Sequence, residues 1–391
     1  MLGFGKTRTA IATILTVARK THTNLRCLIL APTMLVDVWR REIQAVSTAR
    51  FAVVGRGKGA KARKALDDAH FVFVTHRTLV SGCEYALSPV MSWPFIILDE
   101  AHQIRQPSTR INARIMELRD LQPHAKMLLL TATPFINSAL DVSSLLAAAA
   151  ADWSLLNYVG LPTQQHYSRL LINMDENRNW LDHIKCTEHY ETIDMLDKER
   201  DQYNNLITEF INTFDYCTAH VKGNSSVRGS LMKLRRQLEA PSNLNASESA
   251  KWTRLIEIIS DVPVTQRSIV FCIYRHSFGE IERVIKAELG RPVFCLHGGI
   301  AKAARAKLIE TWEATKGGVL VAQLFVAGIG LNLQTMCSTV VFLLRWYNKP
   351  MEQQAVGRVN RFGQKRNTNV FFLRYNCFIE TTWIGAFVKF V

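Results

Sequence analysis

A chain of 391 residues, 48% of them apolar, is long enough to form two or three domains with substantial cores. Its eight cysteines show no Cys-x-x-Cys pair and no zinc-like spacing, and its most apolar long run, residues 145–151, is too short to span a bilayer. We therefore expect a reduced, intracellular protein that is neither secreted nor bound to a membrane. The formal net charge of +15 favours an acidic polymer as partner, although proteins that bind no nucleic acid can also be basic.

The chain opens on the segment Gly3-Phe4-Gly5-Lys6-Thr7, which precedes a helix-like run over residues 8–20. This pattern is typical of the second half of a phosphate-binding loop. Backbone N–H groups would hold phosphate, Lys6 would reach the β- and γ-phosphates, and Thr7 would bind Mg²⁺. Gly3, Gly5, Lys6 and Thr7 are thus candidate nucleotide-binding residues. The strand and first loop residues that normally precede such a motif are absent, because Met1 already lies inside it.

An apolar strand over residues 95–98 runs directly into Asp99 and Glu100. The turning backbone at a strand's end can bring both carboxylates toward one ligand. Asp99 would then bind nucleotide-associated Mg²⁺, and Glu100 would orient and deprotonate the attacking water. The alternative is that the two acids only cap the following helix.

Four apolar strands, residues 27–31, 71–75, 95–98 and 127–131, alternate with helical segments in the first part of the chain. This order predicts a parallel sheet covered on both faces, with its ligand at the carboxyl ends of the strands. Thr131 and Thr133, at the end of the last strand, could bond toward Asp99 and Glu100, but a plain strand exit would look the same.

A second set of strands, residues 268–273, 292–296, 319–322, 340–344 and 370–373, predicts another lobe of similar construction. Residues 151–248 between the two sets look mainly helical, as either protrusions from the lobes or a plain linker. The expected domains are therefore 1–150, 151–248 and 249–391, in an α/β fold of two parallel-sheet lobes with helices on both faces.

Near the end, residues 353–364 set Arg358 and Arg361 three apart, on one face if the segment is helical. Two guanidinium groups on one face suit a triphosphate, because arginine can bridge anionic oxygens in a bidentate manner. Such a pair can also be an ordinary solvated face.

Taken in order, the segments GFGKT, ILDEAH, LLLTATP, AGIGLNL and QQAVGRVNRFGQ resemble the superfamily-two helicase-like ATPases, and specifically the Swi/Snf-type DNA translocases. The resemblance covers nearly the whole chain, and the most family-specific part is Trp346 to Pro350 followed by the arginine segment. It implies two RecA-like lobes with ATP and Mg²⁺ between them. It further implies that Arg358 and Arg361 act as arginine fingers, that Gln354 reports the γ-phosphate and that Gly330 contacts the nucleotide.

Several positions depart from the family pattern. The glutamine-bearing adenine motif that the family places upstream of the phosphate loop has no counterpart in the sequence. Gln323 stands where a hydroxyl residue is common, which puts one DNA-backbone contact in doubt. Arg345 replaces a frequent aspartate, and Asn360 replaces a frequent histidine or tyrosine.

The resemblance implies an ATP-dependent translocase or remodeller that contacts the backbone of double-stranded DNA, with DNA-bound proteins as a further candidate partner. It would work in the nucleus or on viral or chromosomal DNA. Two alternatives stay open: a helicase that separates DNA or RNA strands, and a catalytically impaired nucleic-acid-binding scaffold with an incomplete phosphate loop. The sequence does not define the oligomeric state.

Overall fold

The computed structural model describes residues 5–55, 60–131, 140–149, 184–219, 225–327, 333, 337–346, 349–361 and 363–381. The chain divides into two compact units, Met1–Arg178 and Asn179–Val391, and each is described by itself. The predicted boundaries at residues 150 and 248 remain predictions.

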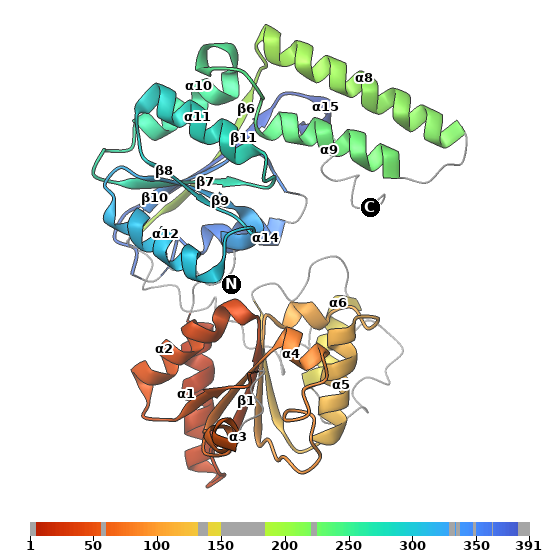
Figure 1. Ribbon diagram of the computed structural model, residues 1–391, viewed down its shortest axis with the longest axis vertical. Helices are drawn as coiled ribbons and strands as arrows, with labels where there is room; N and C mark the ends of the chain where they lie inside the picture. The colour runs from red at the N-terminus through yellow and green to blue at the C-terminus, as the bar shows by residue number, and fades with distance from the viewer. Residues whose placement is uncertain are drawn as a thin grey trace. The chain divides into compact units, whose positions relative to one another are not determined.

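Unit 1 is built on a parallel five-stranded sheet in the order β2-β3-β1-β4-β5 (Figure 1). Its strands are β1 (Cys27–Ala31), β2 (Phe51–Val53), β3 (Phe71–Thr75), β4 (Phe95–Asp99) and β5 (Lys126–Leu130). Its helices are α1 (Lys6–Lys20), α2 (Val36–Val46), α3 (Ala60–Asp67), α4 (His76–Val80), α5 (Arg110–Leu121) and α6 (Leu140–Ala149), with short 3₁₀ turns η1 (Thr33–Leu35) and η2 (Ala101–Ile104). Helices α1 to α3 lie on one side of the sheet and α4 to α6 on the other.

Burial of both faces explains why the central strands read as unbroken apolar runs. All five residues of β1, β3 and β4 are buried. On one face, Leu28, Ile96 and Leu98 pack with Leu118 of α5. The alternating residues of each strand point to the opposite face, where α2 contributes the fully buried Trp39.

Unit 2 contains a parallel six-stranded sheet in the order β6-β11-β10-β7-β9-β8. Its strands are β6 (Cys186–Ile193), β7 (Arg267–Cys272), β8 (Val293–Leu296), β9 (Val319–Gln323), β10 (Cys337–Phe342) and β11 (Thr368–Tyr375). Its helices are α8 (Asp197–Ala219), α9 (Ser225–Glu239), α10 (Ala250–Ser260), α11 (Ser277–Leu289), α12 (Lys302–Ala314), α13 (Leu324–Ala327), α14 (Lys349–Val356) and α15 (Phe378–Thr381), with the 3₁₀ turn η5 (Ala246–Glu248).

Two separate cores cover the two faces of this sheet. One face packs against Trp252 of α10 and Ile281 of α11. The other packs against Leu238 of α9, Trp312 of α12 and Ala355 of α14. The predicted fold class, an α/β protein with two parallel sheets flanked by helices, is therefore confirmed.

Helices α8 and α9 lie side by side as a helical hairpin beside the sheet of unit 2, joined by an ion pair between Lys233 and Glu209 at 2.7 Å (Figure 1). The strand β6, which precedes the hairpin, was not predicted from the sequence. It pairs with β11 over eight residues and is only partly buried, so it lacks the apolar run that marks the central strands. Among the described residues, no helix is both long and apolar enough to cross a membrane.

Candidate functional site

Helix α1 begins at Lys6, directly after Gly5, whose φ of 71° and ψ of 23° place it in the left-handed region. Glycine adopts this conformation without the steric cost that a Cβ brings. Within the described residues, no side chain caps this helix and no acid lies in its first turn. The first N–H groups of the helix therefore present positive partial charge to an anion. Gly3 lies outside the described residues.

Asp99 is the last residue of β4 and is 6% exposed. Its Oδ2 accepts a hydrogen bond from Nε1 of Trp39 at 3.0 Å, and its Oδ1 accepts one from the backbone N–H of Glu100 at 2.9 Å. Burial, followed by the neighbouring charge of Glu100, raises the pKa of Asp99 to about 6, while the charge of Lys6 acts in the opposite direction. The lysine at the start of α1 and the acid at the end of β4 therefore share one electrostatic environment.

Glu100 follows in a left-handed conformation, with φ 52° and ψ 46°. Any residue with a Cβ pays a steric cost in this region. Residues that do adopt it often occur at functional sites. The side chain of Glu100 is 14% exposed, and its Oε2 lies 3.3 Å from Nδ1 of His102. The chain reversal at Glu100 thus sets a second carboxylate beside Asp99 and next to an imidazole.

His76, at the start of α4, connects the acidic segment to the end of β3. Its Nδ1 is hydrogen-bonded to Oε1 of Gln103 at 2.7 Å, so the proton lies on His76 Nδ1. Burial lowers the pKa of His76. The imidazole of His76 therefore ties the segment after β3 to the turn that carries Glu100.

The donor set fits a nucleotide-bound Mg²⁺ better than a metal held by protein alone. Among the described residues, no group of three or more His, Cys, Asp or Glu side chains could hold a metal ion. Mg²⁺ is usually bound through one or two carboxylates together with substrate phosphates. The raised pKa of Asp99 also indicates a buried carboxylate that a cation would stabilise. Asp99 and the hydroxyl of Thr7, in the first turn of α1, are the candidate protein ligands.

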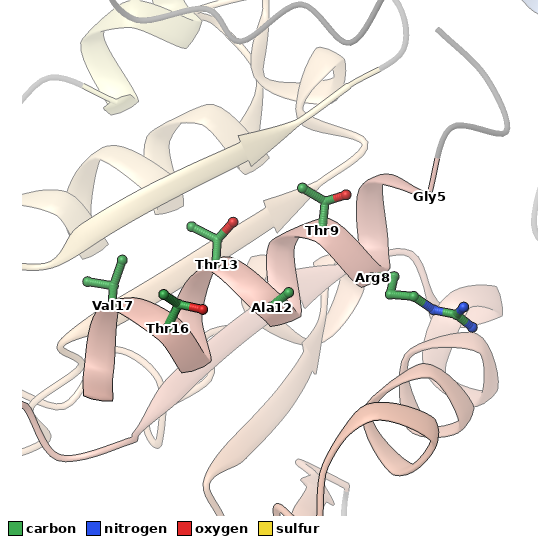
Figure 2. Close-up of a pocket in the computed structure, with 7 residues that line it drawn as sticks. All are labelled: Gly5, Arg8, Thr9, Ala12, Thr13, Thr16 and Val17. Carbon is green, nitrogen blue, oxygen red and sulfur yellow. The ribbon is translucent and has the colours of Figure 1, made fainter. Parts of the chain in front are cut away.

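A groove of about 520 Å³ runs along the outer face of α1 and begins at Gly5 (Figure 2). Its lining consists of Gly5, Arg8, Thr9, Ala12, Thr13, Thr16 and Val17. Thr9, Thr13 and Val17 point to the same side of the helix. Neither Asp99 nor Glu100 contributes to the lining, so the groove does not mark the acidic centre.

In unit 2 the segment that carries both arginines is not helical, because α14 ends at Val356, so the condition for a shared helical face is not met. Arg358 follows on a hydrogen-bonded turn in which its N–H donates to the carbonyl of Ala355 at 3.1 Å. Its own carbonyl accepts from the N–H of Leu333 at 3.0 Å. Gly357, immediately after the helix, explains the early end, since glycine disfavours a helix interior. Gln354 lies on α14, whereas Gly330 and Thr133 lie outside the described residues.

Gln364 fixes the turn that carries Arg361. Its Nε2 donates to the carbonyls of Cys337 at 2.9 Å and Val359 at 3.2 Å, and its Oε1 accepts from the N–H groups of Lys365 and Arg366. The side chain is 6% exposed. Arg358 and Arg361 thus owe their placement to a buried amide rather than to a continuous helix.

Two family models match the chain: SNF2-related domain over residues 2–153 and helicase conserved C-terminal domain over residues 250–363. The chain belongs to the SNF2-related, helicase-like family. The predicted family resemblance is thereby confirmed.

Two bacterial proteins are similar to this SNF2-related chain over most of its length. The putative ATP-dependent helicase/translocase YwqA of Bacillus subtilis is 25% identical over 94% of this chain and 43% of its own length. An uncharacterized ATP-dependent helicase of Mycoplasma pneumoniae is 24% identical over 95% of this chain and 37% of its own length. The SNF2-related chain therefore spans less than half of either relative. A solved structure of the Sulfolobus solfataricus SWI2/SNF2 ATPase core domain is 22% identical, with a TM-score of 0.44, and the match covers 99% of this chain and 82% of that one.

The structure shows which residues Trp39 and Gln323 bond to in the SNF2-related chain. Trp39 is fully buried, and it also donates a hydrogen bond to Asp99, a role that no short motif signals. Gln323, at the end of β9, accepts from the N–H of Gly298 and donates to the carbonyl of Ile273, both at 3.2 Å. It therefore ties the segments that follow β7 and β8 to the end of β9.

Proposed function

We propose that the chain forms the ATP-hydrolysing core of a double-stranded DNA translocase. The proposal rests chiefly on one observation: the buried carboxylate of Asp99 ends β4 directly before the left-handed Glu100, in the same unit whose helix α1 begins with Lys6 after the left-handed Gly5. A phosphate-binding loop and an acidic pair at the carboxyl edge of one parallel sheet form a site for a nucleotide and Mg²⁺.

In unit 1, the first N–H groups of α1 and the ammonium of Lys6 bind the phosphates, while Thr7 and Asp99 hold Mg²⁺. Mg²⁺ supplies neutralisation of the charge on the phosphate oxygens. Trp39 keeps the carboxylate of Asp99 in one orientation through its 3.0 Å hydrogen bond. Glu100 orients the attacking water and accepts its proton, and His102 Nδ1 lies 3.3 Å from its Oε2.

Unit 2 contributes Gln354, Arg358 and Arg361. The two guanidinium groups stabilise negative charge on the transferred phosphoryl group, a role in which one arginine can contribute about 10³–10⁵ in rate. Gln354, on α14, couples the presence of the γ-phosphate to unit 2.

Double-stranded DNA is the proposed polymer. The net charge of +15 supplies favourable, sequence-independent attraction to phosphates. Contacts to the DNA backbone carry little sequence information, which suits movement along a duplex. The name of the Bacillus subtilis relative, a putative helicase/translocase, agrees with this class of activity.

The test is ATP hydrolysis by the purified chain with and without double-stranded DNA. We expect hydrolysis to rise with DNA, Lys6→Ala to lose ATP binding, and Glu100→Gln to bind ATP without hydrolysing it. Equal hydrolysis with and without DNA contradicts the proposal. Absence of ATP binding by the unmodified chain, with DNA binding retained, identifies a nucleic-acid-binding scaffold instead.

Translocation and strand separation are distinguished by two displacement assays. A translocase on duplex DNA removes a triplex-forming third strand and leaves an annealed strand in place. Release of the annealed strand identifies a helicase.

A further inference from the structure

The carboxylate of Glu352, on α14, is almost completely buried and is paired with Arg345, which follows β10. The Glu352 side chain is 2% exposed and that of Arg345 is 19% exposed. Arg345 Nε lies 3.1 and 3.0 Å from the two carboxylate oxygens, and its NH2 lies 2.8 Å from Oε2. The N–H of Trp346 also donates to Oε1 at 2.6 Å. Because loss of one partner would leave a buried charge uncompensated, this pair strongly fixes α14 relative to the end of β10.

Two aromatic rings lie close to the guanidinium group of Arg345 and restrict its orientation. Its Cζ lies 4.5 Å from the ring centre of Phe372 on β11 and 5.2 Å from that of Tyr190 on β6. The two rings stack on each other at 4.9 Å with an interplanar angle of 11°. A lysine could keep the charge, but it could provide neither the bidentate fork nor the stacking.

Arg235, near the end of α9, connects the α8–α9 hairpin to Arg345. Arg235 NH2 donates to the carbonyl of Arg345 at 3.0 Å, and its Nε donates to the hydroxyl of Tyr274 at 3.1 Å. Its Cζ also lies 5.7 Å from the ring centre of Trp346. The α9 helix is therefore bonded directly to the residue that orients α14.

A displacement of α14 would also displace residues 357–361, the arginine turn, which follow the helix directly. Backbone bonds join the end of the helix to this turn: the N–H of Gly357 donates to Gln353 at 2.9 Å, and that of Asn360 donates to Val356 at 2.8 Å. Val359, between the two arginines, is fully buried. The turn thus cannot readily adjust to a displaced helix.

We propose that Arg345 is a positioning residue for Arg358 and Arg361, and that Arg235 links their placement to the α8–α9 hairpin. This inference rests on the proposed function for its catalytic consequence. A ligand that moves the hairpin would change the rate of hydrolysis through Arg235 and the Arg345–Glu352 pair, without contacting the nucleotide.

The first experiment compares Arg345→Lys with Arg254→Lys. Arg254 also makes a bidentate pair, with Glu191 at 2.6 and 2.8 Å, but it lies on α10 and bonds to β6 rather than to α14. At a temperature where both variants are folded, Arg345→Lys should lower the DNA-stimulated kcat by about tenfold or more, since a misplacement of about 1 Å can cost about 10²-fold. The KM for ATP should change little, and Arg254→Lys should keep its kcat. Equal kcat for both variants, or a kcat loss that follows only the folded fraction, overturns the inference.

The second experiment tests the hairpin link by a double-mutant cycle with Arg235→Ala. If both residues act through one path, Arg235→Ala and Arg345→Lys together should lower kcat no more than the larger single change does. Fully additive losses overturn the role assigned to Arg235.

Amide hydrogen exchange of the nucleotide-free protein separates this inference from the proposed function. Arg345→Lys should speed exchange at the amides of residues 357–360, and Arg254→Lys should not. If exchange behaves in this way but the unmodified chain hydrolyses no ATP, the proposed function fails and the positioning link stands. If the unmodified chain hydrolyses ATP and exchange at these amides is unchanged, the positioning link fails.

Discussion

The indole Nε1 of Trp39 donates a hydrogen bond to Oδ2 of Asp99 over 3.0 Å, although the two residues lie 60 positions apart in the chain. Both residues are buried, so the bond is shielded from bulk solvent. The bond favours the ionised carboxylate and partly opposes the rise in the pKa of Asp99 that burial causes. A residue of α2 therefore helps to prepare a carboxylate of β4 for a cation.

Replacing Trp39 with Phe should raise the Mg²⁺ concentration needed for half-maximal ATP hydrolysis by about 10–100-fold, the usual cost of losing a group that orients a metal ligand. Phe keeps much of the buried ring but removes the donor. Trp93→Phe is the matched control, because Trp93 is equally buried and its Nε1 has no hydrogen-bond partner among the described residues. A similar Mg²⁺ shift in both variants would show that loss of packing, not of the bond, is responsible.

The left-handed backbone of Glu100 predicts an unusual order of stability among inactive variants. At a φ of 52° a Cβ is unfavourable, so Glu100→Gly should be more stable than Glu100→Ala by about 1 kcal/mol. Both variants lack the proposed water-orienting carboxylate and should not hydrolyse ATP. Native-state hydrogen exchange in β4 measures the difference. An alanine variant as stable as the glycine variant would mean that this backbone conformation carries no strain.

Gln323→Ser restores a hydroxyl where the family commonly has one, but the shorter side chain cannot reach both Gly298 and Ile273. We expect faster amide exchange at Gly298 and a loss of about 1–3 kcal/mol in the local stability of unit 2. Gln122 makes a comparable brace in unit 1, accepting from the N–H of Trp93 at 3.0 Å and donating to the carbonyl of Met91 at 2.6 Å. Gln122→Ser should destabilise unit 1 without changing exchange at Gly298. Unchanged amide exchange at Gly298 in Gln323→Ser would show that the side chain of Gln323 does not stabilise this segment.

How much could be predicted from the sequence depended on the range of the interactions. The continuous apolar runs of β1, β3 and β4 predicted buried parallel strands, because burial on both faces leaves a direct trace in composition. The edge strand β6 left no such trace. Local motifs likewise pointed to Lys6, Asp99 and Glu100 as one candidate site.

Long-range polar contacts could not be predicted in this way. Spacing alone does not reveal that Trp39 bonds to Asp99, or that Arg345 pairs with Glu352 under an aromatic ring. The turn that carries Arg358 and Arg361 could not be predicted for the same reason. It depends on Gly357 after α14 and on the amide of Gln364, which donates to the carbonyl of Cys337, 27 positions away in the chain.

Glu239, the last residue of α9, should give unit 2 a measurable dependence of stability on pH. Its fully buried carboxylate accepts from the N–H groups of Ile273 and Tyr274 at 2.5 and 2.9 Å and from the hydroxyl of Ser277. Burial raises the pKa of Glu239 to about 7, while these bonds and the charge of Lys251 only partly oppose the rise. Between its ordinary pKa of 4.5 and about 7, the folded state therefore holds a proton that the unfolded state has released.

The sign follows directly, because stability falls with rising pH wherever the folded state binds more protons. Glu239 should thus cost unit 2 up to about 3 kcal/mol as the pH rises from below 4.5 to above 7. Glu239→Gln cannot ionise, so relative to the unmodified chain it should gain about that much over the same range, measured by hydrogen exchange in β7. Glu248→Gln is the control, since Lys198 lowers the pKa of Glu248 and its contribution is lost as the pH falls, the opposite direction. A stability difference between Glu239→Gln and the unmodified chain that stays constant from pH 4.5 to pH 8 would mean that folding does not raise the pKa of Glu239, because the three donors and Lys251 fully offset the effect of burial.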